Sequence, residues 1–265
     1  MKLFSYFYFA VFTSVFVCGC ENYGAHQPVN EKLVVKTETT IQTRFKVPDG
    51  YTRKTNDAAS FGYYLQQLPL KPYGTEVKYY DGSIKKNREV YVSVVDLPIG
   101  KKNLHECADA VMRLRAEWLY KQKRYNDIHF NFLSDGKPRY FKDYAKGDYS
   151  YKKFWAYLEN VFAFANTASL HDELQKVEDI KEIQPGDMLI EKKNPYGHVV
   201  MVVDMAVNDK GEKIVLLAQS YMPAQEIQIL VNPNDPELSP WYHLKEGEII
   251  TPEWYFTSEN HRRFK

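Results

Sequence analysis

The chain has 265 residues, a formal net charge of +1 and 44% hydrophobic residues. A net charge so close to zero gives no electrostatic reason to expect a nucleic-acid partner. The sequence also lacks the Gly-rich loops that bind phosphate groups, so neither its charge nor its motifs indicate a nucleotide-dependent protein.

The first twenty residues have the pattern of a lipoprotein signal peptide. Lys2 precedes an apolar run over residues 3–17, which is short for a membrane span, and Gly19 stands directly before Cys20. We therefore expect residues 1–20 to be a signal peptide and Cys20 to become lipidated. The protein would then be lipid-anchored in a bacterial cell envelope, at the periplasmic face or the cell surface. An uncleaved anchor and an ordinary signal peptide are the alternatives.

The rest of the chain is predicted to form a tether and one domain. Residues 21–39 begin with a polar stretch without a sustained hydrophobic period, which favours a tether. Residues 40–265 are long enough for a single domain with a substantial core. The hydrophobic periods and the turn residues predict helices over 57–68, 103–123 and 151–165, a shorter helix after Ser169, and strands over 90–95, 188–191, 198–207, 213–221 and 226–231.

The best-defined helix is predicted over residues 103–123. Asn103 can cap its start, and Glu106 follows three residues later, as in a capping box. Cys107 then lies in the first turn. The apolar face of this helix is formed by Ala108, Val111, Leu114 and Trp118.

Cys107 is the one cysteine outside the first twenty residues. An exported protein stabilised by disulfides would carry paired cysteines, so no disulfide framework is expected. The thiol is therefore either a small buried apolar group or a reactive group. The first turn of a helix favours the thiolate, and a nearby imidazolium lowers its pKa further, so a nucleophilic role requires a histidine partner.

His198 is the histidine in the most informative position. It follows the turn Pro195-Tyr196-Gly197 and opens the strand 198–207. The run from 199 to 203 has no polar residue, which predicts a central strand covered on both faces.

The strand that follows offers an orienting partner for His198. If residues 208–211 form a hairpin connection, residues 207 and 212 face each other, and Gln219 lies diagonal to His198 on the same sheet face. The amide of Gln219 can fix the tautomer of the imidazole and leave its other nitrogen for the thiol. Tyr221 falls directly opposite His198 and is a competing orienter. Asp204 lies roughly 20 Å along the strand, too far for this role.

Two stretches resemble the NlpC-type peptidases and amidases of the papain-like superfamily. The segment IQPGDMLIEKKNPYGHVVMVVDMAVNDKGEKIVLLAQSY has the Pro-Gly-Asp turn, the strand-opening histidine and the polar third residue of their C-terminal half. The segment HECADAVMRL stands where that family has its nucleophile helix. The resemblance implies an α+β papain-like fold, with the cysteine at a helix N-terminus packed against an antiparallel sheet.

The same resemblance implies the roles of three residues: Cys107 as nucleophile, His198 as general base and Gln219 as orienting residue. It implies a thiol hydrolase that cleaves amide bonds in peptidoglycan stem peptides, without a cofactor. Acyl transfer by the same residues is a further reading. Relative to the family, an N-terminal extension is expected over about 40–100 and an insertion beside the groove over about 121–170.

The chain departs from the family at two points. Ala108-Asp109 follow the cysteine, where the peptidases have Ser-Gly, and 91 residues separate Cys107 from His198. These departures put the substrate in doubt and leave open a catalytically inactive, lipid-anchored module that binds glycan or peptide. The motifs LPLKP, CADAVMRLRAEWLY, PGD, GH, QSYMPAQ and SPWY also resemble a family of bacterial lipoproteins of unknown function.

The motifs YMPAQ and SPWY supply candidates for the wall of a substrate groove: Tyr221, Gln225 and Trp241. Rigid turns packed on the sheet are the alternative for both motifs. Metal binding by Cys107 with His105, His171 or His198 has no support from ligand spacing, so no metal site is expected.

Overall fold

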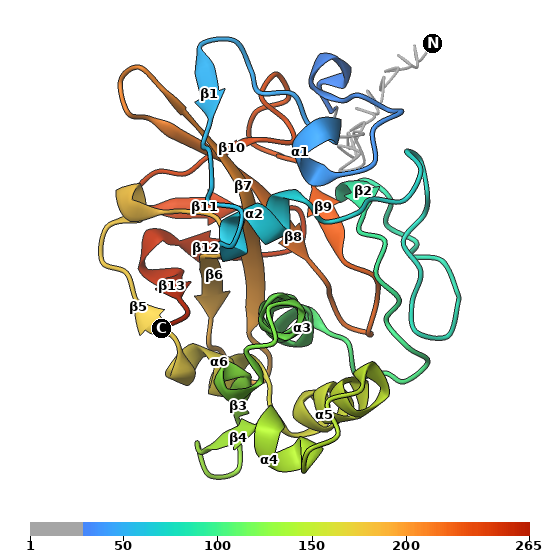
Figure 1. The fold of residues 1–265 in the computed structure, drawn as a ribbon. Coiled ribbons are helices and arrows are strands. Elements are labelled where there is room, and N and C mark those ends of the chain that lie inside the picture. Colours follow the sequence, from blue (N-terminus) through green and yellow to red (C-terminus); the bar gives the residue numbers. More distant parts are fainter. Residues whose placement is uncertain (1–28) are drawn as a thin grey trace, which may run out of the picture.

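The computed structural model describes residues 29–265. The predicted signal peptide, Cys20 and the first part of the predicted tether lie outside these residues. An antiparallel sheet forms one layer, and the longest helix, α3 (Cys107–Lys121), packs against one face of this sheet. The helices that follow α3 in the chain lie on the side of α3 that faces away from the sheet (Figure 1). The protein is therefore of the α+β class.

Six α-helices lie within the described residues. Hydrophobic periodicity located the three long predicted ones to within a few residues, because each buries an apolar face. The segment predicted over 57–68 is shorter than expected, since Ser60 caps it and the residues before Ser60 form a turn. The helices are α1 (Ile41–Arg44), α2 (Phe61–Gln66), α3 (Cys107–Lys121), α4 (Phe141–Ala145), α5 (Tyr151–Phe164) and α6 (Thr167–Glu173), and the 3-10 helices are η1 (Glu31–Leu33), η2 (Tyr125–Asp127), η3 (Ile180–Glu182) and η4 (Ser258–Asn260).

The main sheet has the strand order β2-β9-β8-β7-β6-β13-β5, with β1 also paired to β7 and β10 to β8. Two separate hairpin ladders, β3–β4 and β11–β12, complete the strands. The strands are β1 (Tyr51–Arg53), β2 (Tyr91–Val94), β3 (His129–Asn131), β4 (Pro138–Tyr140), β5 (Gln175–Lys176), β6 (Met188–Glu191), β7 (His198–Asn208), β8 (Lys213–Gln219), β9 (Gln228–Leu230), β10 (Tyr242–His243), β11 (Glu248–Ile250), β12 (Tyr255–Thr257) and β13 (His261–Arg263).

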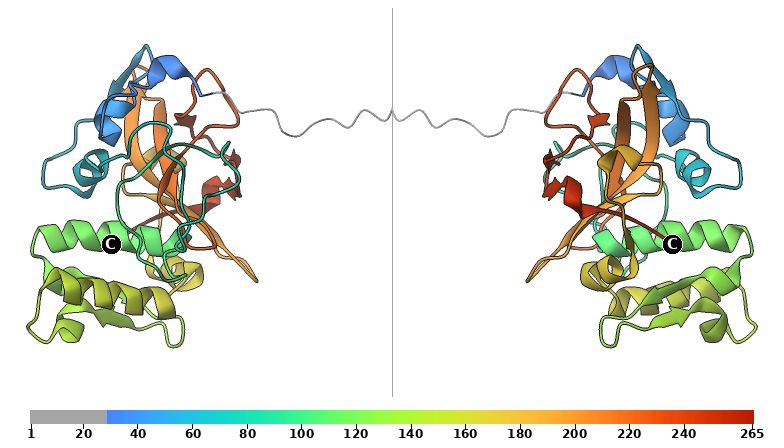
Figure 2. Two further views of the ribbon diagram at one scale, coloured as in Figure 1. Left: turned by 90° about the vertical axis from the view of Figure 1, so that its right-hand side faces the viewer. Right: turned by 90° about the vertical axis from the view of Figure 1, so that its left-hand side faces the viewer.

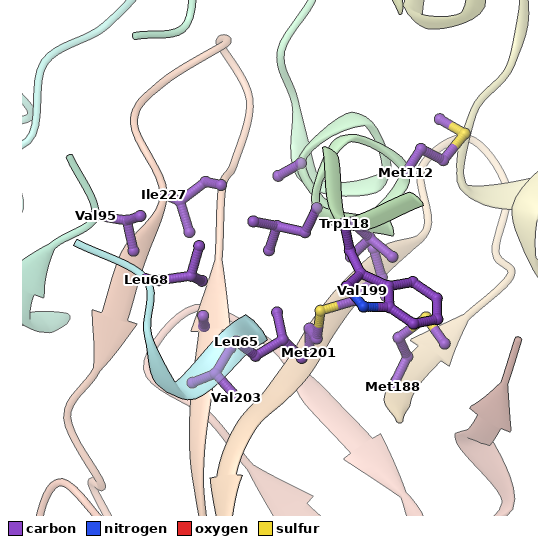
Figure 3. Packing of buried hydrophobic residues seen from close by; sticks show 14 of the residues in the cluster. Leu65, Leu68, Val95, Met112, Trp118, Met188, Val199, Met201, Val203 and Ile227 are labelled. Carbon is purple, nitrogen blue, oxygen red and sulfur yellow. The ribbon is translucent and has the colours of Figure 1, made fainter. Parts of the chain in front are cut away.

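Strand β7 is the centre of the sheet, as its apolar run predicts. Its alternate residues face two different hydrophobic clusters. Val199 and Met201 face the cluster that contains α3, as Figure 3 shows, whereas Val200 and Val202 face the cluster that contains Phe256. The period of two along a strand produces this division. The prediction of a central strand covered on both faces is confirmed.

Helix α3 begins at Cys107, and the predicted start at Asn103 is wrong. Glu106 is the N-cap residue, in extended conformation, and it forms a reciprocal capping box with Asp109. Asn103 instead accepts a hydrogen bond from the Ala224 amide at 2.8 Å. A long-range contact therefore occupies the side chain that could have capped the helix, and Cys107 becomes the first helical residue.

The region between α3 and β6 covers the side of α3 that faces away from the sheet (Figures 1 and 2). Tyr120 of α3 stacks on Phe154 of α5 with ring centroids 4.3 Å apart. Helix α3 is therefore buried on both sides, which explains why its sequence contains more apolar residues than that of a surface helix. Within residues 29–265, every helix is too short or too polar to cross a bilayer.

The described part of the predicted tether is folded onto the domain, so that prediction is wrong for residues 29–39. Leu33 and Val34 are buried in the cluster around α3. Asn30 donates its backbone amide to the Ser239 carbonyl at 3.1 Å. Burial of these two apolar side chains stabilises the folded segment. This gain outweighs the tendency of the surrounding polar residues to stay in solvent.

The Pro-Gly-Asp turn leads into β6 and places Asp187 beneath the C-terminal strand. The Asp187 carboxylate accepts hydrogen bonds from the Gln184 amide, from His261 Nε2 and from two nitrogens of Arg263. Gly186 has φ +95°, and a Cβ there would meet the Phe61 ring at 2.8 Å. The motif therefore serves to join β13 to β6, away from the thiol.

Candidate functional site

The Cys107 sulfur lies at the N-terminus of α3, where the helix meets the first residues of β7. The side chain is 4% exposed. Its sulfur is 3.6 Å from the Thr167 hydroxyl oxygen, and the Ala108 and Val199 amides also face it. A pocket of about 200 Å³ opens next to the thiol, with walls from α5, the start of α6, the loop before β7 and the loop after β8: Phe162, Ala165, Asn166, Ala168, Lys193, Pro195, Tyr196, Gly197 and Met222.

Burial controls the ionisation of this thiol. Burial raises the pKa of Cys107 to about 11, although the hydrogen bonds from Thr167 and from the two amides act in the opposite direction. Asp109, two residues further along α3, adds to the increase. The expected lowering of the thiol pKa by the helix start is therefore wrong for this state, because desolvation of the thiolate outweighs the amides. The resting thiol is neutral.

His198 is the first residue of β7, and its ring lies on the sheet face opposite α3. The ring packs near Tyr221, Trp254 and Phe256, with centroid distances of 4.8, 5.3 and 6.0 Å. Burial lowers the pKa of His198 to about 4, and the charge of Lys85 contributes. The imidazole is therefore neutral at physiological pH and has a lone pair on one nitrogen.

Gln219 holds the imidazole, as the sequence predicts. Its Oε1 lies 2.8 Å from His198 Nε2, and both side chains are buried. Tyr221, the competing orienter, contacts the ring edge-on, and its hydroxyl forms no hydrogen bond with His198 within residues 29–265. The predicted contact between His198 and Gln219 is confirmed.

A β-bulge puts Gln219 in this position. Near the hairpin, Val207 faces Lys213, one residue away from the predicted register. A bulge between Val202 and Asp204 shifts the ladder by one residue, so Met201 faces Ala218 as predicted. The sequence could not indicate the bulge, and the two deviations cancel at the end of the strand where Gln219 lies.

The other end of the Gln219 amide contacts a buried ion pair. Gln219 Nε2 donates to Glu253 Oε2 at 2.6 Å, and the same oxygen accepts from Lys85 Nζ at 2.6 Å. A carboxylate only accepts hydrogen bonds, so this contact identifies the nitrogen end of the amide. Gln219 Oε1 must then accept from His198 Nε2–H, and the lone pair of the imidazole is on Nδ1.

Cys107 lies near the start of β7, where His198 is the first residue, and the two side chains form no direct hydrogen bond. The Val199 amide faces the sulfur, and His198 precedes Val199 in the chain. Within the described residues, the sulfur forms its side-chain hydrogen bond with Thr167 and none with the imidazole. The structure therefore shows a neutral thiol and a neutral imidazole near the start of β7, without a hydrogen bond between them.

The sequence matches the family described as a domain of unknown function (4846) over residues 41–263. The chain belongs to this family. No curated protein and no solved structure matches the chain. In this member of the domain of unknown function (4846), the matched range contains the thiol, the imidazole, Gln219 and the ion pair behind it.

Two of the three predicted groove residues are buried elsewhere. Trp241 is 0% exposed and donates its indole N–H to the Lys46 carbonyl in the core, so its prediction as a groove residue is wrong. Gln225 is buried and bonded to Gln228 and Pro223, so its prediction is also wrong. SPWY is a turn packed in the core, whereas YMPAQ also contributes Met222 to the wall of the pocket beside Cys107. Tyr221 remains beside His198 and partly exposed.

The remaining polar candidates have structural partners. His105 is buried and bonded to the Gln225 carbonyl, and His171 contacts Asp172. Asp204 binds Arg53 and Gln66, which ties the first strand and α2 to β7. Within residues 29–265, no group of three or more His, Cys, Asp or Glu side chains is arranged to hold a metal ion.

Sequence reasoning missed four residues that contact the site: Lys85, Asn103, Thr167 and Glu253. The pattern Asn-Thr-Ala-Ser signals a helix start at Thr167, since Asn166 caps α6 and pairs with Ser169. No local pattern shows that this start contacts Cys107, because 60 residues separate the two. Lys85 and Glu253 lie in loops whose residue types indicate only turns.

The pH dependence of Cys107 alkylation will report the neutral state of the thiol. Because burial raises the pKa to about 11, the rate is expected to rise about tenfold per pH unit from pH 6 to pH 9 without a plateau. Iodoacetamide labelling followed by mass spectrometry measures it, with the urea-unfolded chain as the control for an ordinary thiol. A pH-independent rate below pH 7 would instead show a preformed thiolate.

Proposed function

We propose that the protein is a papain-like, NlpC-type thiol hydrolase that cleaves amide bonds, with Cys107 as nucleophile and His198 as general base. The observation that carries the proposal is the contact between His198 Nε2 and Gln219 Oε1 at 2.8 Å. The Gln219 oxygen accepts the Nε2 proton and so leaves a lone pair on Nδ1, as a general base requires. A histidine that is buried only for packing would not need such a partner. Gln219 is the orienting residue in this scheme.

The reaction begins with the neutral pair. His198 Nδ1 takes the thiol proton while Cys107 Sγ attacks the amide carbonyl carbon, and a tetrahedral oxyanion forms. The imidazolium then gives the proton to the amide nitrogen, the C–N bond breaks and the amine leaves a thioester on Cys107. Water attacks the thioester, His198 takes the water proton, and cleavage of the C–S bond returns the thiol and releases the acid.

The oxyanion would be held at the start of α3. The Cys107 amide is among the four at a helix N-terminus that lack an intrahelical acceptor. The Asn103 side chain lines the same pocket, and its Oδ1 is occupied by the Ala224 amide. Its Nδ2 has no partner among residues 29–265 and is our candidate for the side-chain donor.

A neutral pair suits a site that becomes active when substrate enters. The pKa values of about 11 for Cys107 and about 4 for His198 oppose an ion pair in the empty site. A polarised carbonyl next to the sulfur, held by the donors at the helix start, stabilises the charge that develops during attack. Proton transfer and attack would therefore occur together.

The substrate class follows from the family resemblance and the leader sequence. We place the protein at a bacterial envelope membrane, anchored by a lipid on Cys20, with peptidoglycan stem peptides as its substrate. The pocket beside Cys107, about 200 Å³, has room for a small side chain of such a peptide.

One observation favours a second candidate, a catalytically inactive module of the same fold that binds glycan or peptide. Cys107 is 4% exposed, and its sulfur is bonded to Thr167 from the region that covers α3. In this alternative the thiol is a packing group, and Tyr196 at the pocket rim, which is 62% exposed, supplies a contact surface.

Product analysis separates the two. The purified protein is incubated with soluble muropeptides, and mass spectrometry follows new amine and carboxyl termini and an acyl adduct on Cys107. The hydrolase predicts both the new termini and the adduct, and a transferase predicts the adduct with an amine acceptor joined to the acyl group. Muropeptide binding without an adduct or new termini would support the binding module.

A further inference from the structure

We propose that the buried ion pair of Lys85 and Glu253 is a positioning element that sets the tautomer of His198 through Gln219. This inference rests on the proposed function for its catalytic meaning. The contacts run without interruption from Lys85 Nζ to Glu253 Oε2, from that oxygen to Gln219 Nε2, and from Gln219 Oε1 to His198 Nε2.

The chemistry of each group fixes the direction of the next hydrogen bond. An ammonium only donates, and a carboxylate only accepts. The Gln219 amide must present its NH₂ group to Glu253, and its oxygen then faces the imidazole. Without Glu253, the amide has no reason to prefer this orientation over the flipped one, and His198 could donate or accept at Nε2.

The position of the ion pair argues against a simple surface contact. The Lys85 side chain is 3% exposed and that of Glu253 15% exposed. A buried ion pair costs desolvation energy and is weak evidence for a contribution to stability, so a role in fixing polar geometry is a better account of its place. Lys85 also lies 5.6 Å from the centre of the Tyr221 ring, which packs on His198.

The element joins distant parts of the chain. Lys85 belongs to the predicted N-terminal extension, and its backbone amide donates to the Val77 carbonyl at 2.8 Å. Glu253 precedes Trp254, whose ring packs near His198 and whose indole N–H donates to Glu191. The extension therefore contributes a charged residue to the candidate site, beyond its packing on the sheet.

The tautomer can be observed directly by nitrogen NMR of protein labelled with ¹⁵N-histidine, at about pH 8, where histidines are neutral. A His198→Asn variant assigns the His198 signals. In the unmodified sequence, we expect the proton on Nε2 and the lone pair on Nδ1. In the double variant Lys85→Leu/Glu253→Leu, the Nδ1–H form should rise from a minor species to roughly half of the population, because both amide orientations become available.

Two further variants make this test specific. Glu253→Gln is expected to retain the Nε2–H form, because an amide oxygen in place of Oε2 can still accept from Lys85 and Gln219. The matched control is Lys71→Leu/Glu226→Leu, which removes another partly buried Lys–Glu pair and should leave the tautomer unchanged. If Lys85→Leu/Glu253→Leu does not fold, Lys85→Met/Glu253→Met, which keeps the length of both side chains, repeats the test.

An Nδ1–H form in the unmodified sequence, or a pure Nε2–H form after removal of Glu253, would overturn the inference. The measurement needs no substrate, so its outcome is independent of turnover. Loss of the tautomer preference in a protein without turnover would support the positioning element and count against the hydrolase. An unchanged tautomer in a protein whose turnover depends on Cys107 would support the hydrolase and count against the positioning element.

Discussion

Replacement of Cys107 by serine is expected to lower the rate of amide cleavage at least about a thousandfold. The attacking group must lose its proton to His198, whose pKa is held near 4 by burial, so the base is weak. A serine hydroxyl is a far weaker acid than a thiol and a poorer nucleophile in its neutral form. The measurement is the initial rate of release of new amine termini from the muropeptide that the unmodified protein cleaves.

The serine variant should fold as the unmodified chain does. The hydroxyl is smaller than the thiol, so the substitution leaves only a small gap, and a hydroxyl at position 107 can bond to Thr167; the free energy of unfolding should therefore change by less than about 2 kcal/mol. Cys107→Ala is the companion variant, with the same loss of rate. A serine variant that retains more than about a tenth of the rate would contradict the role of Cys107.

The sequence located the strands of the candidate site well because their patterns are local. Strand β6 has the predicted bounds, and β7 extends the predicted range by one residue. In β7 an apolar run follows a turn with Gly197, where a Cβ would lie 2.2 Å from the Glu191 carbonyl oxygen. The turn residues before the strand and the continuous apolar run are both local patterns, and the structure adds the steric reason for the glycine.

Contacts between distant segments were beyond sequence reasoning. The start of α3 depends on Asn103 contacting Ala224, and the burial of Trp241 depends on a carbonyl at Lys46. The sequence around Asn103 or Trp241 does not show whether a distant partner binds the side chain. Local patterns therefore predicted the type of element, and tertiary contacts decided its first residue and its exposed face.

The pKa of the thiol shows the same limit in electrostatic terms. The helix start predicts a lowered pKa, and the amides of Ala108 and Val199 do lower it. The region that covers α3 also removes water from the sulfur, and this raises the pKa by more than the amides and the Thr167 hydroxyl lower it. Desolvation depends on the complete packing around a group, so it cannot be read from the residues next to Cys107.

The second large effect concerns stability: Asp187→Asn is expected to lower the free energy of unfolding by about 3 kcal/mol. The carboxylate is fully buried and accepts from His261 at 2.8 Å and from Arg263 at 2.6 and 2.8 Å. An amide keeps one acceptor oxygen and turns an NH₂ group toward donors, so at least one buried hydrogen bond is lost and Arg263 loses its counter-charge.

Urea unfolding followed by tryptophan fluorescence measures this loss, with Asp172→Asn as the matched control. Asp172 pairs with Lys192 at the surface, where an ion pair contributes below about 1 kcal/mol. Because Asp187 joins β13 to β6, the variant should also expose the C-terminal strand to proteolysis before the rest of the domain. A loss no larger than that of the surface control would mean that backbone pairing alone holds β13, and the Pro-Gly-Asp motif would then need another explanation.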